Sequence, residues 1–360
     1  MELFHAHNQW ATRPADEKFA SLAQLYAATR GYAEIAAEKI VPWQDVRTEA
    51  VDGDLHLIGK AGVPARLTHH AFGQIAQKVG APGNYLRTLP ATLAAQNLNF
   101  GLKNVDENGN EAMLLFHQNG ELILRAATSE KYARIWNYEV VERLINVEQR
   151  FGLTPAKSTF RSFDPNEMPA LYASDHDMFA FLMSKEREIK GPDGSSLFRG
   201  IITINSEVGA GALKILSFYF RDICGNHIIW GAREIAEVKL VHRGNIRERW
   251  MNAQVEIRKY LDGAASLDEA KFESTLVRIP GGSKDEVLDT IFAQKKALPA
   301  GTTRTLLEAG YDAVEPNQDG DPDTVWGLAQ GLTRYSQTIP FADDRQFVDR
   351  VAGKVLDLVF

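Results

Sequence analysis

The side chains with the clearest capacity for binding in this 360-residue chain are positively charged and aromatic ones between positions 218 and 250. Single-strand binding proteins combine a positive groove with aromatic rings on which bases stack, because every base has a π-face. We therefore predict a surface for single-stranded nucleic acid along residues 233–249. Its predicted contact residues are Arg221, Arg233, Lys239, His242, Arg243, Arg247, Arg249 and Trp250. In the alternative interpretation the aromatic rings are core and the arginines pair with Glu234, Glu237 and Glu248.

A second group of polar side chains lies at the predicted ends of strands. Its members are Asp175, Asp177, Asn205, Glu207, Asn226 and His227. Carboxylates beside an imidazole suggest a metal site, but successive residues of a strand point to opposite faces, so only Asp175 and Asp177 could share an ion. The pattern favours a polar turn at a strand start. The Asn205–Gly209 run lacks the lysine of a phosphate-binding loop, so it indicates a strand end followed by a turn.

Cysteine usage argues against two further chemistries. Cys224 is the only cysteine, so the chain has no internal disulfide, which fits a reducing compartment. A nucleophilic role with His227 as base would need a depressed thiol pKa, whereas cysteines at strand ends are usually small buried apolar residues. One cysteine and dispersed histidines do not give a zinc-binding spacing. We predict no metal and no cofactor.

The elements that must position these residues indicate an α+β fold. Apolar strand-forming runs at 201–204, 213–220 and 228–230 alternate with polar turns, and an amphipathic helix follows over 246–260. We predict an antiparallel sheet of β-hairpins with helices packed on one face, between helical N- and C-terminal regions. Another hairpin is expected at 111–128, around Asn119-Gly120.

Three regions follow from this order of elements. Residues 1–105 are predicted to be a mostly helical N-terminal region. Residues 106–265 form the central core of β-hairpins and a helix, and residues 266–360 form a helical closing region.

Several of these segments resemble one known family. Ser174–Phe181, Asn205–Gly209, Phe218–Arg221 and Cys224–Gly231 are similar to a phage- and plasmid-borne family catalogued as domain of unknown function 932. Weaker similarity extends the match over most of residues 65–335. The resemblance implies an origin in mobile elements, and it supplies no established catalytic residues.

Composition and charge limit the classes of partner that the protein could bind. Hydrophobic residues make up 44% and charged residues 24%, as in ordinary globular proteins. No apolar run approaches the roughly 20 residues of a membrane span, and no secretory signal pattern opens the chain, so we expect a cytoplasmic protein of a bacterial host without a membrane partner.

The net charge of the chain is −7. Residues 178–260 nevertheless carry 13 Lys/Arg against 9 Asp/Glu. This positive middle segment suits a nucleic-acid strand, or it is a solvated helix face.

Two classes of function fit these observations. The first is a homo-oligomeric protein of phage or plasmid type that binds single-stranded DNA and assists annealing or recombination. The alternative is a metal-assisted enzyme or an anti-host-defence factor that acts at the polar ends of the central sheet. The absence of a complete catalytic motif favours the binding protein.

Overall fold

The computed structural model describes residues 17–59, 62–105, 111–156, 170–186, 188–221, 226–228, 234–236, 246–336, 338–339 and 342–360. Within them the fold is α+β, as predicted from the sequence, with two sheets and a C-terminal group of helices.

The central sheet is antiparallel and follows the strand order β1-β9-β10-β12-β13-β14, with β8, β11 and β15 paired beside this path. Its strands are β1 (Lys18–Phe19), β8 (Leu153–Pro155), β9 (Leu171–Ala173), β10 (Met178–Ser184), β11 (Ile189–Lys190), β12 (Ser196–Asn205), β13 (Lys214–Arg221), β14 (Asn226–Ile228) and β15 (Glu234–Ala236). The longest pairing joins β12 to β13 and runs from Leu197↔Arg221 to Ile204↔Lys214. The predicted hairpin strands therefore exist and are neighbours.

Helices cover one face of this sheet. They are α1 (Leu22–Glu34), α5 (Asn137–Phe151) and α6 (Ile246–Leu261). Their apolar stripes meet inward-facing strand residues such as Leu182 and Ile201 in one core cluster. The opposite face carries a second buried cluster, rich in phenylalanine, in which the rings of Phe181 and Phe218 meet edge to face with centroids 6.1 Å apart.

The second sheet belongs to a unit that we call the N-terminal module, residues 36–129. Its strand order is β2-β6-β7-β5-β4-β3, and β5 runs parallel to β7. Its strands are β2 (Ala36–Pro42), β3 (Arg47–Val51), β4 (Asp54–Ile58), β5 (Pro64–Leu67), β6 (Glu111–Asn119) and β7 (Glu121–Ser129). Helices α2 (His69–Lys78), α3 (Gly83–Thr88) and α4 (Ala91–Lys103) complete the module, and side chains of all three join its core.

The module differs from the predicted division of the chain at residue 105. The β6–β7 hairpin forms as expected, but it pairs with β2 and β5 instead of joining the central sheet. The 1–105 region contains helices α1 to α4, and it also supplies four strands of this sheet. The physical reason is that β2 and β5 leave open edges at which a hairpin completes the backbone hydrogen bonding.

The N-terminal module interrupts the part of the chain that builds the central sheet. Strand β1 pairs with β9 through Lys18↔Tyr172 and Phe19↔Leu171. Helices α1 and α5, which precede and follow the module, share one core cluster beneath that sheet. The module is therefore an insertion between two neighbouring helices.

The C-terminal helical unit, residues 265–360, packs around Phe272 and Trp326, whose rings meet edge to face at 5.6 Å, in a core that also includes Ile189, Leu197 and Tyr219 of the central sheet. It contains α7 (Ala265–Glu273), a 3-10 turn (Ser274–Leu276), α8 (Lys284–Ala293), α9 (Arg304–Asp312), α10 (Pro316–Asp319), α11 (Val325–Ser336) and α12 (Ala342–Val355). Helices α9 and α11 approach so closely that a Cβ at Gly331 would lie 2.1 Å from the Gly310 carbonyl oxygen.

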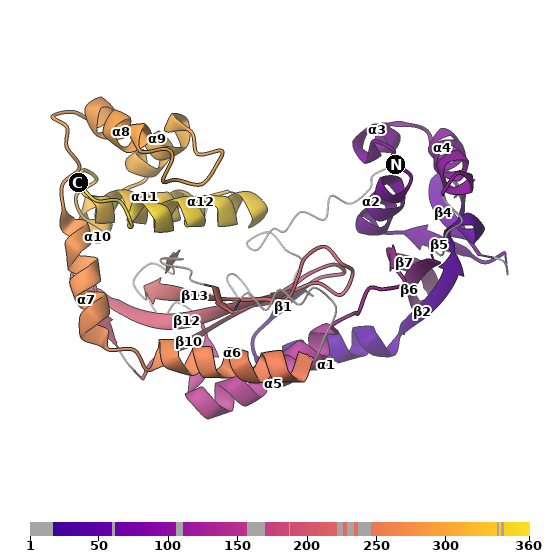
Figure 1. The fold of residues 1–360 in the computed structure, drawn as a ribbon, viewed down its shortest axis with the longest axis horizontal. Coiled ribbons are helices and arrows are strands. Elements are labelled where there is room, and N and C mark those ends of the chain that lie inside the picture. The colour runs from indigo at the N-terminus through magenta and orange to yellow at the C-terminus, as the bar shows by residue number, and fades with distance from the viewer. Residues whose placement is uncertain are drawn as a thin grey trace.

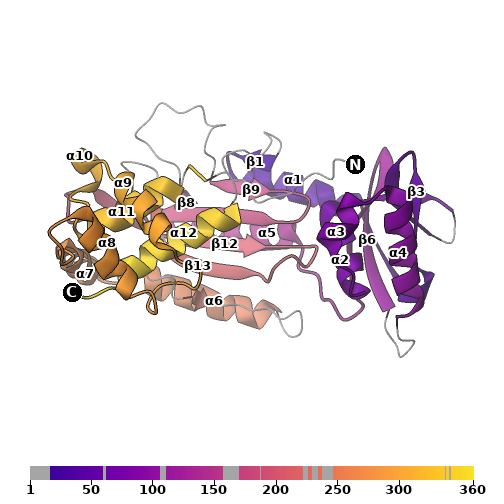
Figure 2. The ribbon, with the colours of Figure 1, turned by 90° about the horizontal axis from the view of Figure 1, so that it is seen from above.

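The three parts form a U shape. The central sheet is at the bottom of the U, and the N-terminal module and the C-terminal helical unit rise from its opposite ends, on the side away from α1, α5 and α6 (Figure 1). Figure 2 shows the two units from above, with the sheet between them. In both views α2 and α3 lie on the side of the module that faces the C-terminal unit, with α4 farther out. Within the described ranges, no helix has the length and apolar character needed to cross a membrane.

Candidate functional site

Two of the residues predicted to contact nucleic acid are buried. Arg221, at the end of β13, has no exposed surface, and Trp250 of α6 packs into the core beneath the sheet near Ile257. A side chain in either place cannot reach a phosphate or a base. The prediction was wrong for these two residues. Residue type and spacing could not separate them from exposed ones, because their burial depends on partners distant in sequence.

The other predicted contact residues keep their status as predictions. Arg247 and Arg249 lie in the first turn of α6, where the backbone is described. Four more fall outside the described residues, namely Arg233, Lys239, His242 and Arg243. Cys224 also falls outside them.

Arg221 instead joins the central sheet to the C-terminal helical unit. Its Nη1 donates to Asp319 Oδ1 and to Gln330 Oε1, both at 3.2 Å, and its Nε donates to Ser195 Oγ at 3.0 Å. It also pairs with Asp193. Asp319 is buried as well, and its Oδ2 accepts from Arg334 Nε at 2.7 Å. These contacts join a strand end to α10 and α11 through charge-assisted hydrogen bonds.

The polar strand-end residues come together where the central sheet meets the N-terminal module. Glu207, just after β12, pairs with Arg125 of β7 at 3.0 Å, and their side chains are only 1% and 2% exposed. The other Glu207 oxygen accepts the Asn137 backbone N–H at the start of α5, at 2.8 Å. Arg125 also donates to the Asp175 carbonyl and to His117 Nε2, each at 2.9 Å. We call Arg125, His117, Asp175, His176, Glu207 and His70 the junction cluster.

Asn205 and Asp177 brace the same region. Asn205 donates to Asn137 Oδ1 at 2.7 Å and to the Ile135 carbonyl at 3.0 Å. Asp177 accepts from Ser174 Oγ at 2.8 Å in a turn that leads into β10, which matches the interpretation favoured from sequence. Asn226 and His227 lie on β14, opposite Arg221 and Phe220.

Two histidine rings stack inside the junction cluster. His70 and His176 have centroids 6.4 Å apart, and His70 Nε2 lies 3.2 Å from the Val208 carbonyl oxygen. Burial lowers the pKa of His70, and the neighbouring His176 acts in the same direction. Burial together with the Arg125 charge lowers the pKa of His117 to about 3. The rings of His70 and His117 therefore stay neutral at physiological pH.

The junction cluster compensates its own charges. The Arg125 guanidinium lies against the Glu207 carboxylate and the Asp175 carbonyl. In the part of the chain that the structure describes, no group of three His, Cys, Asp or Glu side chains is placed to hold a metal ion. The arrangement supports a clamp between the two sheets, and we derive no reaction from it.

The lowered pKa of His117 predicts a loss of stability in mild acid. The folded protein keeps the ring neutral down to about pH 3, whereas the unfolded chain takes up a proton below its ordinary value of 6.5. Stability is therefore lost as the pH falls from 6.5. The limiting slope for one proton is about 1.4 kcal/mol per pH unit, and we expect about half of this because the ring is partly exposed. Urea unfolding between pH 7 and 5 measures the slope. His117→Gln should flatten it, and equal slopes in parent and variant would refute this origin.

One charge feature of the N-terminal module went unnoticed in the sequence. Residues 55–105 contain no Asp or Glu but hold Lys60, Arg66, Lys78, Arg87 and Lys103. The net charge of the whole N-terminal half is negative, so a sum over that half conceals the positive segment. The net charge of a shorter stretch of sequence reveals it.

The acid-free segment includes α2, α3 and α4 and two strongly exposed aromatic rings. Tyr85 of α3 is 60% exposed and Phe100 of α4 is 74% exposed. Exposed rings in a segment with positive residues and no acids are the combination expected of a single-strand binding surface. The module therefore has features that the sequence analysis assigned to residues 233–249.

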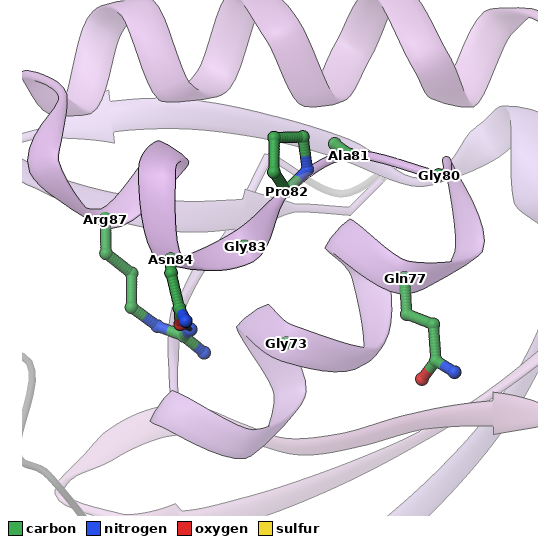
Figure 3. A pocket seen from close by; sticks show the side chains of 8 residues that line it. All are labelled: Gly73, Gln77, Gly80, Ala81, Pro82, Gly83, Asn84 and Arg87. Carbon is green, nitrogen blue, oxygen red and sulfur yellow. Dashed lines mark hydrogen bonds between the residues drawn. The ribbon is translucent and has the colours of Figure 1, made fainter.

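A pocket of about 470 Å³ lies between α2 and α3 in the same segment. Figure 3 shows its lining residues, Gly73, Gln77, Gly80, Ala81, Pro82, Gly83, Asn84 and Arg87. Arg87 is the only charged residue among these eight. Asn84 and Gln77 add carboxamide groups, and three glycines leave the wall free of side chains.

Comparison with known proteins places the chain in a family. The model of the family described as "Domain of unknown function (DUF932)" matches residues 168–349, just over half of the chain. The chain belongs to this family, as the resemblance predicted. The match covers strands β9 to β15 and most of the C-terminal helical unit, and it leaves out the N-terminal module. Neither the curated proteins nor the solved structures contain a match.

Proposed function

We propose that this DUF932 protein binds single-stranded nucleic acid. The observation that carries the proposal is the segment 55–105, whose sequence holds five Lys/Arg and no acid in a chain of net charge −7, together with its two exposed aromatic rings. Positive side chains attract phosphates and exposed rings stack with bases, so together they favour an unpaired strand over a duplex.

The predicted face at residues 233–249 is the second part of the proposed surface. It contributes Arg233, Lys239, His242, Arg243, Arg247 and Arg249, without Arg221 and Trp250. The module and the α6 end of this face belong to one chain, so weak contacts at both would add to a useful affinity.

The finer parts of the proposal concern the biological setting. We propose a cytoplasmic, homo-oligomeric protein of phage or plasmid origin that serves strand annealing or recombination. Support comes from the mobile-element origin that the sequence resemblance implies and from the modest size of each charged surface. Lining up several copies would multiply the affinity without any new contact.

Fluorescence anisotropy with a labelled 30-nucleotide strand and its duplex, at several salt concentrations, tests the proposal. We expect weak binding that favours the single strand, with a log–log salt slope of about −0.7 for each phosphate neutralised. Two triple variants separate the surfaces. One carries Tyr85→Ala, Phe100→Ala and Lys103→Ala, and the other carries Arg243→Ala, Arg247→Ala and Arg249→Ala. The first should weaken binding by about tenfold or more, because one stacked base contributes about 1–3 kcal/mol. The second should weaken it because it removes three positive charges that attract phosphates. The arginine variant should also flatten the salt slope.

The control removes positive charge where acids already balance it. Arg258 and Lys259 of α6 pair with Asp262 and Glu256 on the surface. The double variant Arg258→Ala, Lys259→Ala should bind within twofold of the parent. If the parent bound neither nucleic acid at low salt, the proposal would be wrong. If both triple variants bound like the parent, the positive segments would be solvated surface only.

A further inference from the structure

Arg87 has an unusual environment for a charged side chain. Its Nη1 donates to Asn84 Oδ1 at 3.1 Å and its Nη2 to the His69 carbonyl at 3.2 Å. The guanidinium carbon lies 4.9 Å from the centre of the Phe72 ring. Its Nε is buried and has no hydrogen-bond partner within the described structure. The side chain is thus held in place by neutral groups and a ring.

No carboxylate of the described residues balances this charge. Among the described residues Arg87 forms no ion pair, and the nearest acids in the sequence are Asp54 and Asp106. Other arginines of the protein show the contrast. Arg66, on the same module, pairs with Glu121 at 2.7 Å, and Arg125 pairs with Glu207. Burial lowers the pKa of Arg87, yet a guanidinium stays charged at neutral pH. A positioned cation without an acid at the wall of a pocket favours an anion inside it.

The glycines keep the pocket open beside this cation. A Cβ at Gly73 would lie 3.3 Å from Arg87 Nη2, and one at Gly83 would lie 3.5 Å from Nη1. Any larger side chain would therefore occupy the space that an anion needs next to the guanidinium. The wall also carries the Gln77 and Asn84 carboxamides, which can donate further hydrogen bonds to a ligand with several acceptor oxygens.

We propose that the pocket between α2 and α3 binds the phosphate group of a nucleotide, with Arg87 as its charged contact. The guanidinium fork matches phosphate geometry, and the acid-free surroundings favour a doubly charged anion over a carboxylate. A volume of about 470 Å³ is large enough for a nucleotide-sized ligand. Where the phosphate belongs to a strand, this inference rests on the proposed function, and where it belongs to a free nucleotide it does not.

Calorimetric titration of the full-length protein tests the pocket with inorganic phosphate, adenosine monophosphate and acetate as separate probes. We expect the two phosphates to bind more tightly than acetate. Arg87→Gln should lower phosphate affinity by at least tenfold, and Arg87→Lys should lose most of it, because an ammonium lacks the fork. Arg47 of the same module pairs with Glu49 at the surface. Arg47→Gln therefore removes one positive charge outside the proposed surface and should bind like the parent.

A glycine substitution separates ligand binding from folding. Gly73→Ala places a methyl group beside Arg87 inside α2, where alanine is the better helix former. Its melting temperature should match or exceed that of the parent, while its phosphate affinity should fall several-fold. Gly31→Ala is the matched control, since it lies within α1 and its Cβ would meet nothing within 4 Å. It should gain stability and keep phosphate binding unchanged.

The source of the phosphate is resolved by comparing strands with and without a 5′-phosphate. A preference for the 5′-phosphorylated strand that Arg87→Gln abolishes would assign the pocket to a strand end, and tight binding of the mononucleotide alone would assign it to a free nucleotide. The pocket proposal fails if the parent binds no phosphate, if acetate binds equally well, or if Arg87→Gln retains parental affinity. Strand binding that survives Arg87→Gln leaves the proposed function intact, whereas phosphate binding without any strand binding overturns the proposed function alone.

Discussion

Arg221→Met is expected to lower the free energy of unfolding by about 3–5 kcal/mol, which is the cost of removing one partner from a buried ion pair. The substitution leaves Asp319 buried with one arginine instead of two, and it leaves Gln330 Oε1 and Ser195 Oγ without the donor that they share. The C-terminal helical unit should therefore separate from the sheet end. Urea unfolding followed by circular dichroism measures the change.

A surface arginine provides the control for this prediction. Arg304 pairs with Asp285 and Asp289, whose side chains are mostly exposed. Arg304→Met should cost far less than Arg221→Met, because solvent already screens these pairs. Equal losses in the two variants would show that burial does not decide the contribution of Arg221.

The second large effect is expected for Glu207→Gln. The substitution removes the charge that balances buried Arg125, so about 3–5 kcal/mol should be lost. It also weakens the acceptor for the Asn137 N–H at the start of α5. Because the cluster joins the two sheets, hydrogen exchange should rise first around residues 130–137 and at the end of β12.

Glu121→Gln is the matched control on the same module. Glu121 pairs with Arg66 at the surface, where both side chains are about half exposed. Its removal should change stability by no more than about 0.5 kcal/mol. If Glu207→Gln unfolded like Glu121→Gln, the junction would be held by apolar packing and not by the charge pair.

Local sequence signals predicted much of the secondary structure because they report local physics. Thr68 caps α2 through its side chain, which accepts the Ala71 N–H, and Gly80 follows that helix with a positive φ. Asn119-Gly120 forms its hairpin between β6 and β7. Each feature depends on neighbours within a few residues, so pattern and propensity suffice.

Burial and sheet membership could not be predicted in this way, because they depend on contacts between residues that are far apart in the sequence. Arg221 lies near aromatic residues in the sequence, as the other predicted contacts do, yet it is buried because Asp319 lies 98 residues away in the sequence and 3.2 Å away in space. The assignment of the β6–β7 hairpin to a sheet failed for the same reason. The Arg87 pocket has no motif of its own, and only the absence of acids from residues 55–105 indicated it.

The insertion of the N-terminal module between α1 and α5 has a consequence for synthesis on the ribosome. Strand β1 must wait for its partner, since Phe19 pairs with Leu171. At ~5–20 residues per second this interval lasts roughly 8–30 s. The module completes all of its own strand pairs by residue 129, before β9 exists. During that time the apolar residues Leu22 and Leu25 of α1 have no sheet to cover them. The nascent chain thus carries a completed module beside a helix whose apolar face is still uncovered.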